Sequence, residues 1–218
     1  MGRGFARGGS DPCPVPACYC RVTVAQSRLP AVRRRRQLLD VSLEVFAKNG
    51  FHGTSMAEVA EAAGVTKPVL YQHFGSKRDL YLKLLDDVGQ RLLEEVQKAT
   101  ASAGGPRQQV ASGFEAYFRF VADHESAFRL LFGGDGREAD KEFADAVRHV
   151  EDAMADAVAA LIEADIDDDH RRLLAFGIVG LAEATSRYWV LGGRREAPVV
   201  LSRRVADMAW AGLRGVRR

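Results

Sequence analysis

Apolar residues recur every three or four positions along most of the chain, which is the spacing of an amphipathic helix. In residues 33–50, RRRRQLLDVSLEVFAKNG, the apolar positions Leu38, Leu39, Val45 and Phe46 fall on one face. The closing Asn-Gly pair is a C-terminal stop signal. The pattern predicts a first helix whose leading end is basic.

A short second helix is predicted to begin after Ser55. Ser55 and Glu58 have the S-x-x-E spacing of a capping box, in which each side chain accepts a hydrogen bond from a free backbone N–H group. Met56 and Val59 give this helix an apolar face, and Gly64 ends it.

A third helix is expected only two residues later, with Thr66 as a possible cap. Pro68 falls in its first turn, where the missing N–H group has no cost. Gly75 interrupts the chain, and Ser76 with Asp79 begins a long fourth helix. Two short helices behind a longer one are the layout of a helix-turn-helix, although a bundle with short segments has similar punctuation.

The polar residues of the third helix favour DNA binding. In TKPVLYQHF, residues 66–74, the side chains of Val69, Leu70 and Phe74 can pack inward. The polar remainder is then free to face a partner: Lys67, Tyr71, Gln72 and His73.

The rest of the chain reads as one helix after another. Further helices are predicted at 107–123, 125–132, 138–164, 168–191 and 198–216, after breaks at 101–106, 133–136 and 192–193. Strand alternation, a nucleotide-binding glycine signature and internal repeats do not appear. We therefore expect an all-α protein of about nine helices.

Charge adds information at the N-terminus. The formal net charge is only +2, but residues 1–36 carry eight arginines against a single acid, Asp11. A basic end on an acidic body points to a polyanionic partner, although basic tails also occur for solubility. Because residues 1–30 are rich in Gly, Pro and Arg without periodicity, we expect them to form a disordered extension.

The three cysteines, Cys13, Cys18 and Cys20, lie within this extension. Three thiols can begin a metal site, but no fourth ligand follows at zinc-like spacing, so we interpret them as incidental. The sequence has no run of about 18 apolar residues and no signal-peptide core. These features predict a cytoplasmic protein without a membrane span.

Residues 33–82 closely resemble the N-terminal domain of TetR-type bacterial regulators. The resemblance lies in LLDVSLEVFAKNGFHGTSMAEVAEAAGV and TKPVLYQHFGSKRDLY. The matching positions are Phe46, Gly50, Thr54, Ala60, Gly64, Tyr71, Phe74, Lys77 and Leu80. Turn glycines, caps, core and contact residues agree together, which makes the match specific over about a quarter of the chain.

The resemblance implies a helix-turn-helix DNA-binding domain at 31–80 and an effector-binding and dimerisation domain at 81–218. The recognition helix would enter the major groove of double-stranded DNA by its N-terminal end, at Thr66. There Lys67 can donate to guanine, Pro68 can touch a thymine methyl group, and Gln72 can read adenine or touch phosphate.

Other residues are expected to hold the DNA backbone. By resemblance, Tyr71 and His73 grip phosphate, and Lys77 is the phosphate-binding lysine of the fourth helix. Thr54 and Ser55 are plausible phosphate contacts as well as caps. The basic run can add backbone or minor-groove contacts: Arg33, Arg34, Arg35 and Arg36. Tyr71 can instead belong partly to the core, and His73 can simply cap its own helix.

The resemblance implies an effector pocket within the C-terminal helices. It also implies that the last two helices of the chain pair with those of a second subunit. Aromatic residues are our candidates for an apolar pocket: Phe114, Tyr117, Phe118, Phe128, Phe132, Phe143, Phe176, Tyr188 and Trp189. The candidates for the dimer interface are Leu174, Ile178, Leu181, Val205, Met208 and Trp210. Both sets can equally be ordinary core. We expect an apolar effector such as a lipid, an acyl thioester or a drug-like molecule.

Two clusters resemble catalytic or metal sites. The acidic stretch DIDDDH, residues 165–170, fits a metal site less well than a helix start, where acids favour the dipole. His124 between Asp123 and Glu125 fits a turn into the next helix. No nucleophile with a base and an orienting group appears, so we expect no catalysis, metal or cofactor.

The leading hypothesis is therefore a ligand-responsive TetR-type repressor that binds a pseudo-palindromic operator as a homodimer. Two alternatives remain open at this point. One is an enzyme or ligand carrier on a helical scaffold, which needs a reactive set of residues in the C-terminal body. The other is a sequence-tolerant, architectural DNA binder without an effector.

Overall fold

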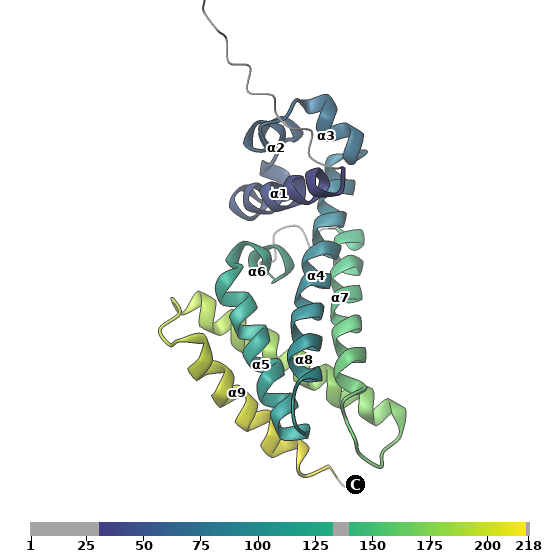
Figure 1. Ribbon diagram of the computed structural model, residues 1–218, viewed down its shortest axis with the longest axis vertical. Coiled ribbons are helices and arrows are strands. Elements are labelled where there is room, and N and C mark those ends of the chain that lie inside the picture. The colour runs from purple at the N-terminus through teal and green to yellow at the C-terminus, as the bar shows by residue number, and fades with distance from the viewer. Residues whose placement is uncertain (1–30, 133–139, 217–218) are drawn as a thin grey trace, which may run out of the picture.

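The computed structural model describes residues 31–132 and 140–216, and within them every regular element is a helix (Figure 1). In chain order these are α1 (Ala31–Gly53), α2 (Met56–Ala62), α3 (Lys67–His73), α4 (Lys77–Ala101), α5 (Pro106–Asp123), α6 (Glu125–Phe132), α7 (Lys141–Ala159), α8 (Asp168–Leu191) and α9 (Pro198–Leu213). The predicted all-α class is confirmed. The expected extension at 1–30 and the break at 133–136 lie outside the described residues.

Helices α1, α2 and α3 pack together at one end of an elongated molecule (Figure 1). Their apolar faces meet in a small core that buries Leu38 and Phe46 of α1, Val59 of α2, Leu70 of α3 and the following Phe74. The helical geometry of α1 breaks at the glycine of the predicted stop signal, Gly50, where φ is 69°. The core therefore uses the apolar positions that the sequence periodicity marks.

The turn between α2 and α3 follows the sequence prediction closely. Both hydrogen bonds of the capping box are present, with Ser55 Oγ accepting from the Glu58 N–H group and Glu58 accepting from that of Ser55. Gly64 has a φ of 64°, a conformation that residues with a Cβ rarely adopt. Thr66 precedes α3 but makes no side-chain cap. The proline in the second helical position, Pro68, lacks one of the two N–H groups that such a cap would use.

Helix α4 runs from the three-helix end into the rest of the molecule (Figure 1). Ser76 caps it by accepting from the Asp79 N–H group at 3.0 Å. Midway along, a Cβ on Gly89 would lie only 2.3 Å from Cγ2 of Val150 on α7. The glycine therefore allows α4 and α7 to approach closely.

The other end of the molecule is a bundle in which α5 packs on α4 and α9, and α7 packs on α4 and α8. Helix α6 lies under α1, where Ser126 donates to Glu44 at 2.8 Å. Two predicted helices extend too far: the one expected at 138–164 is Lys141–Ala159, and the one expected at 198–216 ends at Leu213. The domain boundary near residue 80 stays a prediction, because α4 is continuous across it.

Candidate nucleic-acid interface and effector cavity

Helix α3 exposes the side chains that were predicted to contact DNA. Lys67, Pro68 and Gln72 are exposed, and Tyr71 keeps 43% of its surface accessible. The Lys67 ammonium lies 5.9 Å from the centre of the Tyr71 ring, so the two side chains share one outer surface. His73 is half-buried beside the ring of Phe74. Thr66 is exposed just before the helix.

The loop before α2 contributes one exposed and one buried residue. Ser55 is exposed, although its hydroxyl already accepts the capping hydrogen bond. Thr54 is buried, and its hydroxyl donates to the Gly50 carbonyl at 2.8 Å. In this structure Thr54 therefore ties the end of α1 to the start of α2.

Lys77 lies at the junction of α1, α2 and α4. Its ammonium donates to the carbonyl groups of Phe51 and Thr54, both at 2.8 Å, and sits 4.5 Å from the centre of the Phe51 ring. Two of its three N–H donors thus hold the helix-turn-helix together, and a third remains for another acceptor.

Of the four arginines at the start of α1, the last two contact residues outside this helix. Arg33 is exposed, and Arg34 donates to Gln37 at 3.1 Å. Arg35 places its guanidinium 4.9 Å from the centre of the Phe74 ring. Arg36 donates to Asp87 of α4 at 2.9 Å. The last two arginines therefore stabilise the packing of α1, which the sequence alone did not indicate.

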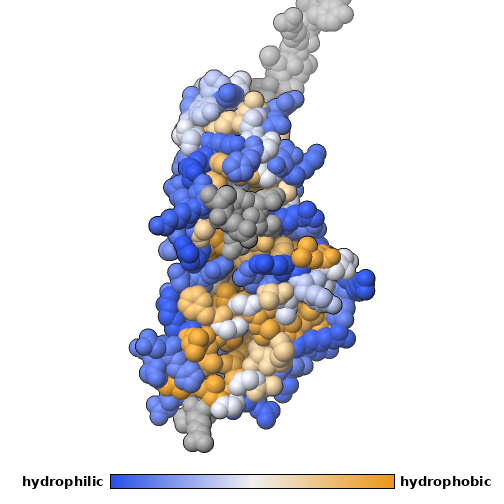
Figure 2. Space-filling model, turned by 180° about the vertical axis from the view of Figure 1, so that it is seen from behind, coloured by the Kyte–Doolittle hydropathy of each residue, from blue (hydrophilic) through white to orange (hydrophobic). Residues whose placement is uncertain are grey.

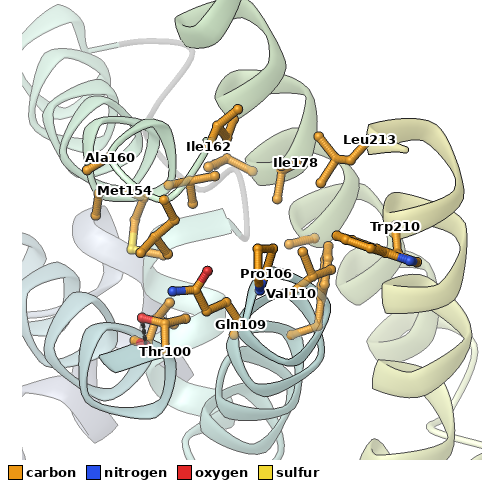
Figure 3. Close-up of a pocket in the computed structure, with 18 of the residues that line it drawn as sticks. Thr100, Pro106, Gln109, Val110, Met154, Ala160, Ile162, Ile178, Trp210 and Leu213 are labelled. Atoms are coloured by element: carbon orange, nitrogen blue, oxygen red, sulfur yellow. Dashed lines mark hydrogen bonds between the residues drawn. The ribbon is translucent and has the colours of Figure 1, made fainter. Parts of the chain in front are cut away.

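An apolar cavity of about 700 Å³ lies between α4, α5, α7, α8 and α9. Figure 3 shows Met154 of α7, Val110 of α5 and Leu213 of α9 converging on this space. A cavity of this size and lining suits one ligand of drug-like or lipid size. Its lining consists mainly of alanine, valine, leucine and isoleucine rather than aromatic residues.

A buried tyrosine contributes a polar atom beside the cavity. Tyr117 lines the cavity from α5, and its hydroxyl lies 3.3 Å from Oγ of Ser186 on α8. Ser186 in turn donates to the Glu183 carbonyl at 2.8 Å. Burial raises the pKa of the Tyr117 phenol well above its usual range, so the group stays neutral and available as a donor.

Both parts of the chain, the helix-turn-helix and the helical bundle, match known protein families. The model described as "Bacterial regulatory proteins, tetR family" matches residues 38–84, and "Tetracyclin repressor-like, C-terminal domain" matches residues 106–212. The HTH-type transcriptional activator FasR of Mycolicibacterium smegmatis is 35% identical over 189 residues, which cover 86% of this chain and 86% of FasR. The chain belongs to the TetR family of bacterial transcriptional regulators.

Solved structures and a further relative agree with this assignment. A TetR-like regulator from Rhodococcus sp. RHA1 superposes with a TM-score of 0.70 at 31% identity, over 86% of this chain and all of that one. FadR of Bacillus subtilis, solved in complex with stearoyl-CoA, gives 0.69 at 18% identity, over 80% and 96% of the two chains. The fatty acid metabolism regulator protein of Bacillus subtilis is 21% identical over 184 residues, covering 81% of this chain and 94% of that protein. The helix-turn-helix of this TetR-family chain is thus its DNA-binding element.

The aromatic residues predicted for the pocket are distributed over several places in this TetR-family fold. Phe114 and Tyr117 line the cavity. Phe128 and Phe132 line a second hollow between α1, α4, α6 and α8. The others lie outside the cavity lining: Phe118, Phe143 and Trp189 are buried in the core, and Phe176 and Tyr188 are exposed on α8. Aliphatic helix faces gave no sequence signal that separates a cavity wall from ordinary core.

The residues predicted for the dimer interface are also divided. Ile178 and Trp210 line the cavity, and Val205 is buried. Leu174 and Leu181 are partly buried, whereas Met208 is 55% exposed. Because α8 and α9 carry apolar residues on more than one face, the sequence pattern does not indicate which face points outward.

An apolar outer surface nevertheless exists on α8. The exposed residues on this side of the helix are Leu173, Phe176, Gly177, Gly180, Ala184, Tyr188 and Leu191. Val199, Val200 and Met208 of α9 are exposed as well. Figure 2 shows apolar surface concentrated in the half of the molecule away from the helix-turn-helix. We call these exposed residues of α8, together with Val199, Val200 and Met208 of α9, the outer α8/α9 face.

The two clusters that resembled catalytic or metal sites have structural partners. Asp167 caps α8 by accepting from the His170 N–H group at 2.7 Å, and Asp168 pairs with Arg171. Glu125, beside His124, pairs with Arg129 and Arg194. Within 31–132 and 140–216, no group of three or more His, Cys, Asp or Glu side chains is arranged to hold a metal ion. No helix in those ranges is long and apolar enough to cross a membrane.

Proposed function

We propose that this TetR-family chain is a ligand-responsive regulator that acts in the cytoplasm as a homodimer on a pseudo-palindromic operator. We further propose that its effector is a long-chain acyl compound. The apolar cavity of about 700 Å³ is the observation that carries the sensing part of the proposal. It is large enough for a flexible hydrocarbon chain and offers few polar groups to any other ligand.

The DNA-reading part of the proposal assigns sequence readout to α3. Lys67, Pro68 and Gln72 project from the exposed side of this helix, while Leu70 anchors it to the core. We assign base contacts to these three residues, and backbone contacts to Tyr71 and His73 and to the exposed Thr66 and Ser55. Arg33 and Arg34 remain candidates for phosphate contacts from the start of α1.

The dimer is assigned to the outer α8/α9 face. Leu173, Phe176 and Tyr188 place large apolar groups on the surface of α8. Between Phe176 and Tyr188, the small residues Gly177, Gly180 and Ala184 form a flat stripe. A second copy of the same face can approach closely along this stripe and bury the apolar groups in a four-helix arrangement. Two-fold symmetry then presents two α3 helices to successive major grooves, about 34–36 Å apart.

The acyl assignment is supported by the cavity chemistry and by two relatives. The Bacillus subtilis relative is a fatty acid metabolism regulator, and the superposed FadR structure holds stearoyl-CoA. In the present chain the two hydroxyl groups of the cavity are already engaged. Thr100 donates to carbonyl groups of its own helix, and Tyr117 pairs with Ser186. Engaged hydroxyls favour binding over nucleophilic catalysis.

Helix α4 provides a direct mechanical link between effector and DNA. Its C-terminal half lines the cavity through Val96 and Thr100, and its N-terminal residue Lys77 holds the end of α1. A ligand that shifts the C-terminal half of α4 can therefore change the spacing of the two α3 helices in a dimer.

The sequence predicts a repressor, whereas FasR is named an activator. Either sign is compatible with this link, since the sign depends on where the operator lies relative to the promoter.

The test is fluorescence anisotropy of labelled operator DNA, with stearoyl-CoA added to the full-length protein. We expect saturable binding of the acyl compound and at least a fivefold change in operator affinity, the lower end of ordinary allosteric coupling. Val110→Trp, which fills the cavity, should abolish the response but not DNA binding. Ala111→Trp is the matched control, because Ala111 is exposed beside Val110 and does not line the cavity. An acyl response that survives Val110→Trp would place the effector elsewhere.

A further inference from the structure

The cavity has two unlike ends. The lining residues near its first end are buried, among them Phe114 and Tyr117 of α5, Met154 of α7 and Ala182 of α8. At the other end they are exposed, among them Pro106 and the residues Ala101, Ala160 and Arg214. The lining residues of α5, α7 and α8 become more buried from the second end to the first, so the cavity is closed at the first end and open at the second.

The open end lies far from the DNA-binding helices. Figure 1 shows that α4 ends, α5 begins and α9 ends at the extremity opposite to α1, α2 and α3. Polar lining residues gather there, including the exposed Gln97, Glu163 and Arg214. An amphipathic molecule can keep its polar head in water only at this mouth.

At the closed end Tyr117 lines the cavity, and its hydroxyl group is paired with Ser186, which lies outside the lining. This hydrogen bond joins α5 to α8 at 3.3 Å, and Ser186 is fully buried and also donates to the Glu183 carbonyl. Phe118 and Trp189 of the same two helices are buried outside the cavity lining and pack edge to face. A hydrocarbon tail has no group to replace a buried hydrogen bond, so it has no reason to displace this pair.

We propose that the effector enters tail first and that the Tyr117–Ser186 pair ends the tail channel, so that it sets the longest acyl chain bound with full affinity. This inference rests on the acyl effector proposed above and goes beyond it by naming the residues that select chain length. From Pro106 at the mouth to Tyr117 at the closed end, α5 advances 11 residues, or about 16 Å at 1.5 Å per residue.

The test is calorimetric titration of the full-length protein with lauroyl-, myristoyl-, palmitoyl-, stearoyl- and arachidoyl-CoA. The wild-type affinity should rise with chain length to one preferred member and then fall. Tyr117→Leu opens the closed end, so its preferred chain should be longer by at least one member of the series. Ala182→Val adds two methyl groups beside the closed end. They shorten the channel, so the preferred acyl chain of this variant should be shorter than that of the wild type.

The matched control is Phe120→Leu. Phe120 is buried on the same helix but does not line the cavity, so its replacement disturbs the core without changing the channel. Its chain-length preference should equal that of the wild type. The control therefore separates a shift in preference from a general loss of stability.

The outcomes separate the two proposals. If the wild type binds none of the five compounds, the acyl effector fails and the chain-length selection fails with it. If the wild type binds them but Tyr117→Leu and Ala182→Val keep its preferred chain, only the assignment of the closed end is overturned. Should Tyr117→Leu fail to fold, the shift to a shorter chain in Ala182→Val decides the question alone.

Discussion

At the scale of single residues, two lysines ten positions apart in the chain have different surroundings. Lys67 is exposed on α3, and its ammonium lies 5.9 Å from the centre of the Tyr71 ring. Lys77 is half-buried and donates to the carbonyl groups of Phe51 and Thr54. The base contact proposed for Lys67 fits its exposure, whereas Lys77 is part of the frame that holds the helix-turn-helix.

Replacing each lysine by alanine should therefore give different results. Lys67→Ala is expected to relax sequence preference, because a lysine that donates to a base edge discriminates by about 1–3 kcal/mol per good contact. Its thermal stability should be unchanged. Lys77→Ala should weaken specific and non-specific DNA alike, and should lower the free energy of unfolding by about 1–3 kcal/mol because it leaves two carbonyl groups without their donor.

The measurement is binding to operator and to scrambled duplex, together with thermal unfolding of both variants. Equal losses on specific and non-specific DNA for both variants would refute the assignment of Lys67 to a base edge. A Lys77→Ala variant of wild-type stability would show that its hydrogen bonds have no structural role.

Several residues at this scale were predictable and others were not. The capping box of Ser55 and Glu58 follows from residues three positions apart, and it is present as predicted. The roles of Arg35 and Arg36 depend on Phe74 and Asp87, which lie 39 and 51 positions further along the chain. Contacts over such separations exist only after the fold has formed, so local pattern does not reveal them.

At the scale of elements, the contact of α4 with α7 depends on one glycine. A Cβ on Gly89 would lie 2.3 Å from Cγ2 and 2.8 Å from Cγ1 of Val150. Valine is stiff at χ1, so the side chain has little freedom to move away.

Gly89→Ala should therefore destabilise the protein by about 1–3 kcal/mol, the usual effect of overpacking, despite the better helix propensity of alanine. Gly212→Ala is the control, because a Cβ there meets open space. It should leave the free energy of unfolding unchanged or raise it slightly. Denaturant unfolding of both variants is the measurement, and equal stability for the two would contradict the close approach of the helices.

Element prediction succeeded where the signals were local. Glycine, proline and capping residues placed the start of most helices within a few positions. The cavity was harder to foresee, because its walls are aliphatic and alanine-rich stretches of five helices that resemble ordinary core. Aromatic residues, which the sequence suggested for the pocket, lie mostly in the core or on the outer α8/α9 face.

At the scale of the whole molecule, an ion pair joins the DNA-binding end to the bundle. Asp140, the N-cap of α7, pairs with Arg78 near the start of α4, and Arg78 also donates to Glu142 at 2.6 Å. The hydrogen bonds from Arg78 hold the pKa of Asp140 below its usual range. A carboxyl whose pKa is lower in the folded state than in the unfolded state stabilises the fold while it is ionised.

This stabilisation should be complete above the unfolded pKa, about 3.9, and should be lost as the pH falls through the lower folded value. Asp140→Asn keeps a good capping residue but removes the charge. We expect its stability to depend less on pH between about 5 and 2 than that of the wild type. Asp86→Asn, which replaces an exposed acid of α4, is the control. Thermal unfolding across this range would refute the account if the wild type and Asp140→Asn had parallel profiles.

Sequence-specific DNA reading by α3 and a two-fold dimer through the outer α8/α9 face are the two central proposals for the whole molecule. The most direct test is selection of randomised DNA duplexes with the purified full-length protein, followed by sequencing of the bound pool. We predict a pseudo-palindrome whose half-site centres lie about one helical turn of DNA, or a multiple of it, apart. A flat profile without a repeated half-site would contradict the account and favour a sequence-tolerant DNA binder.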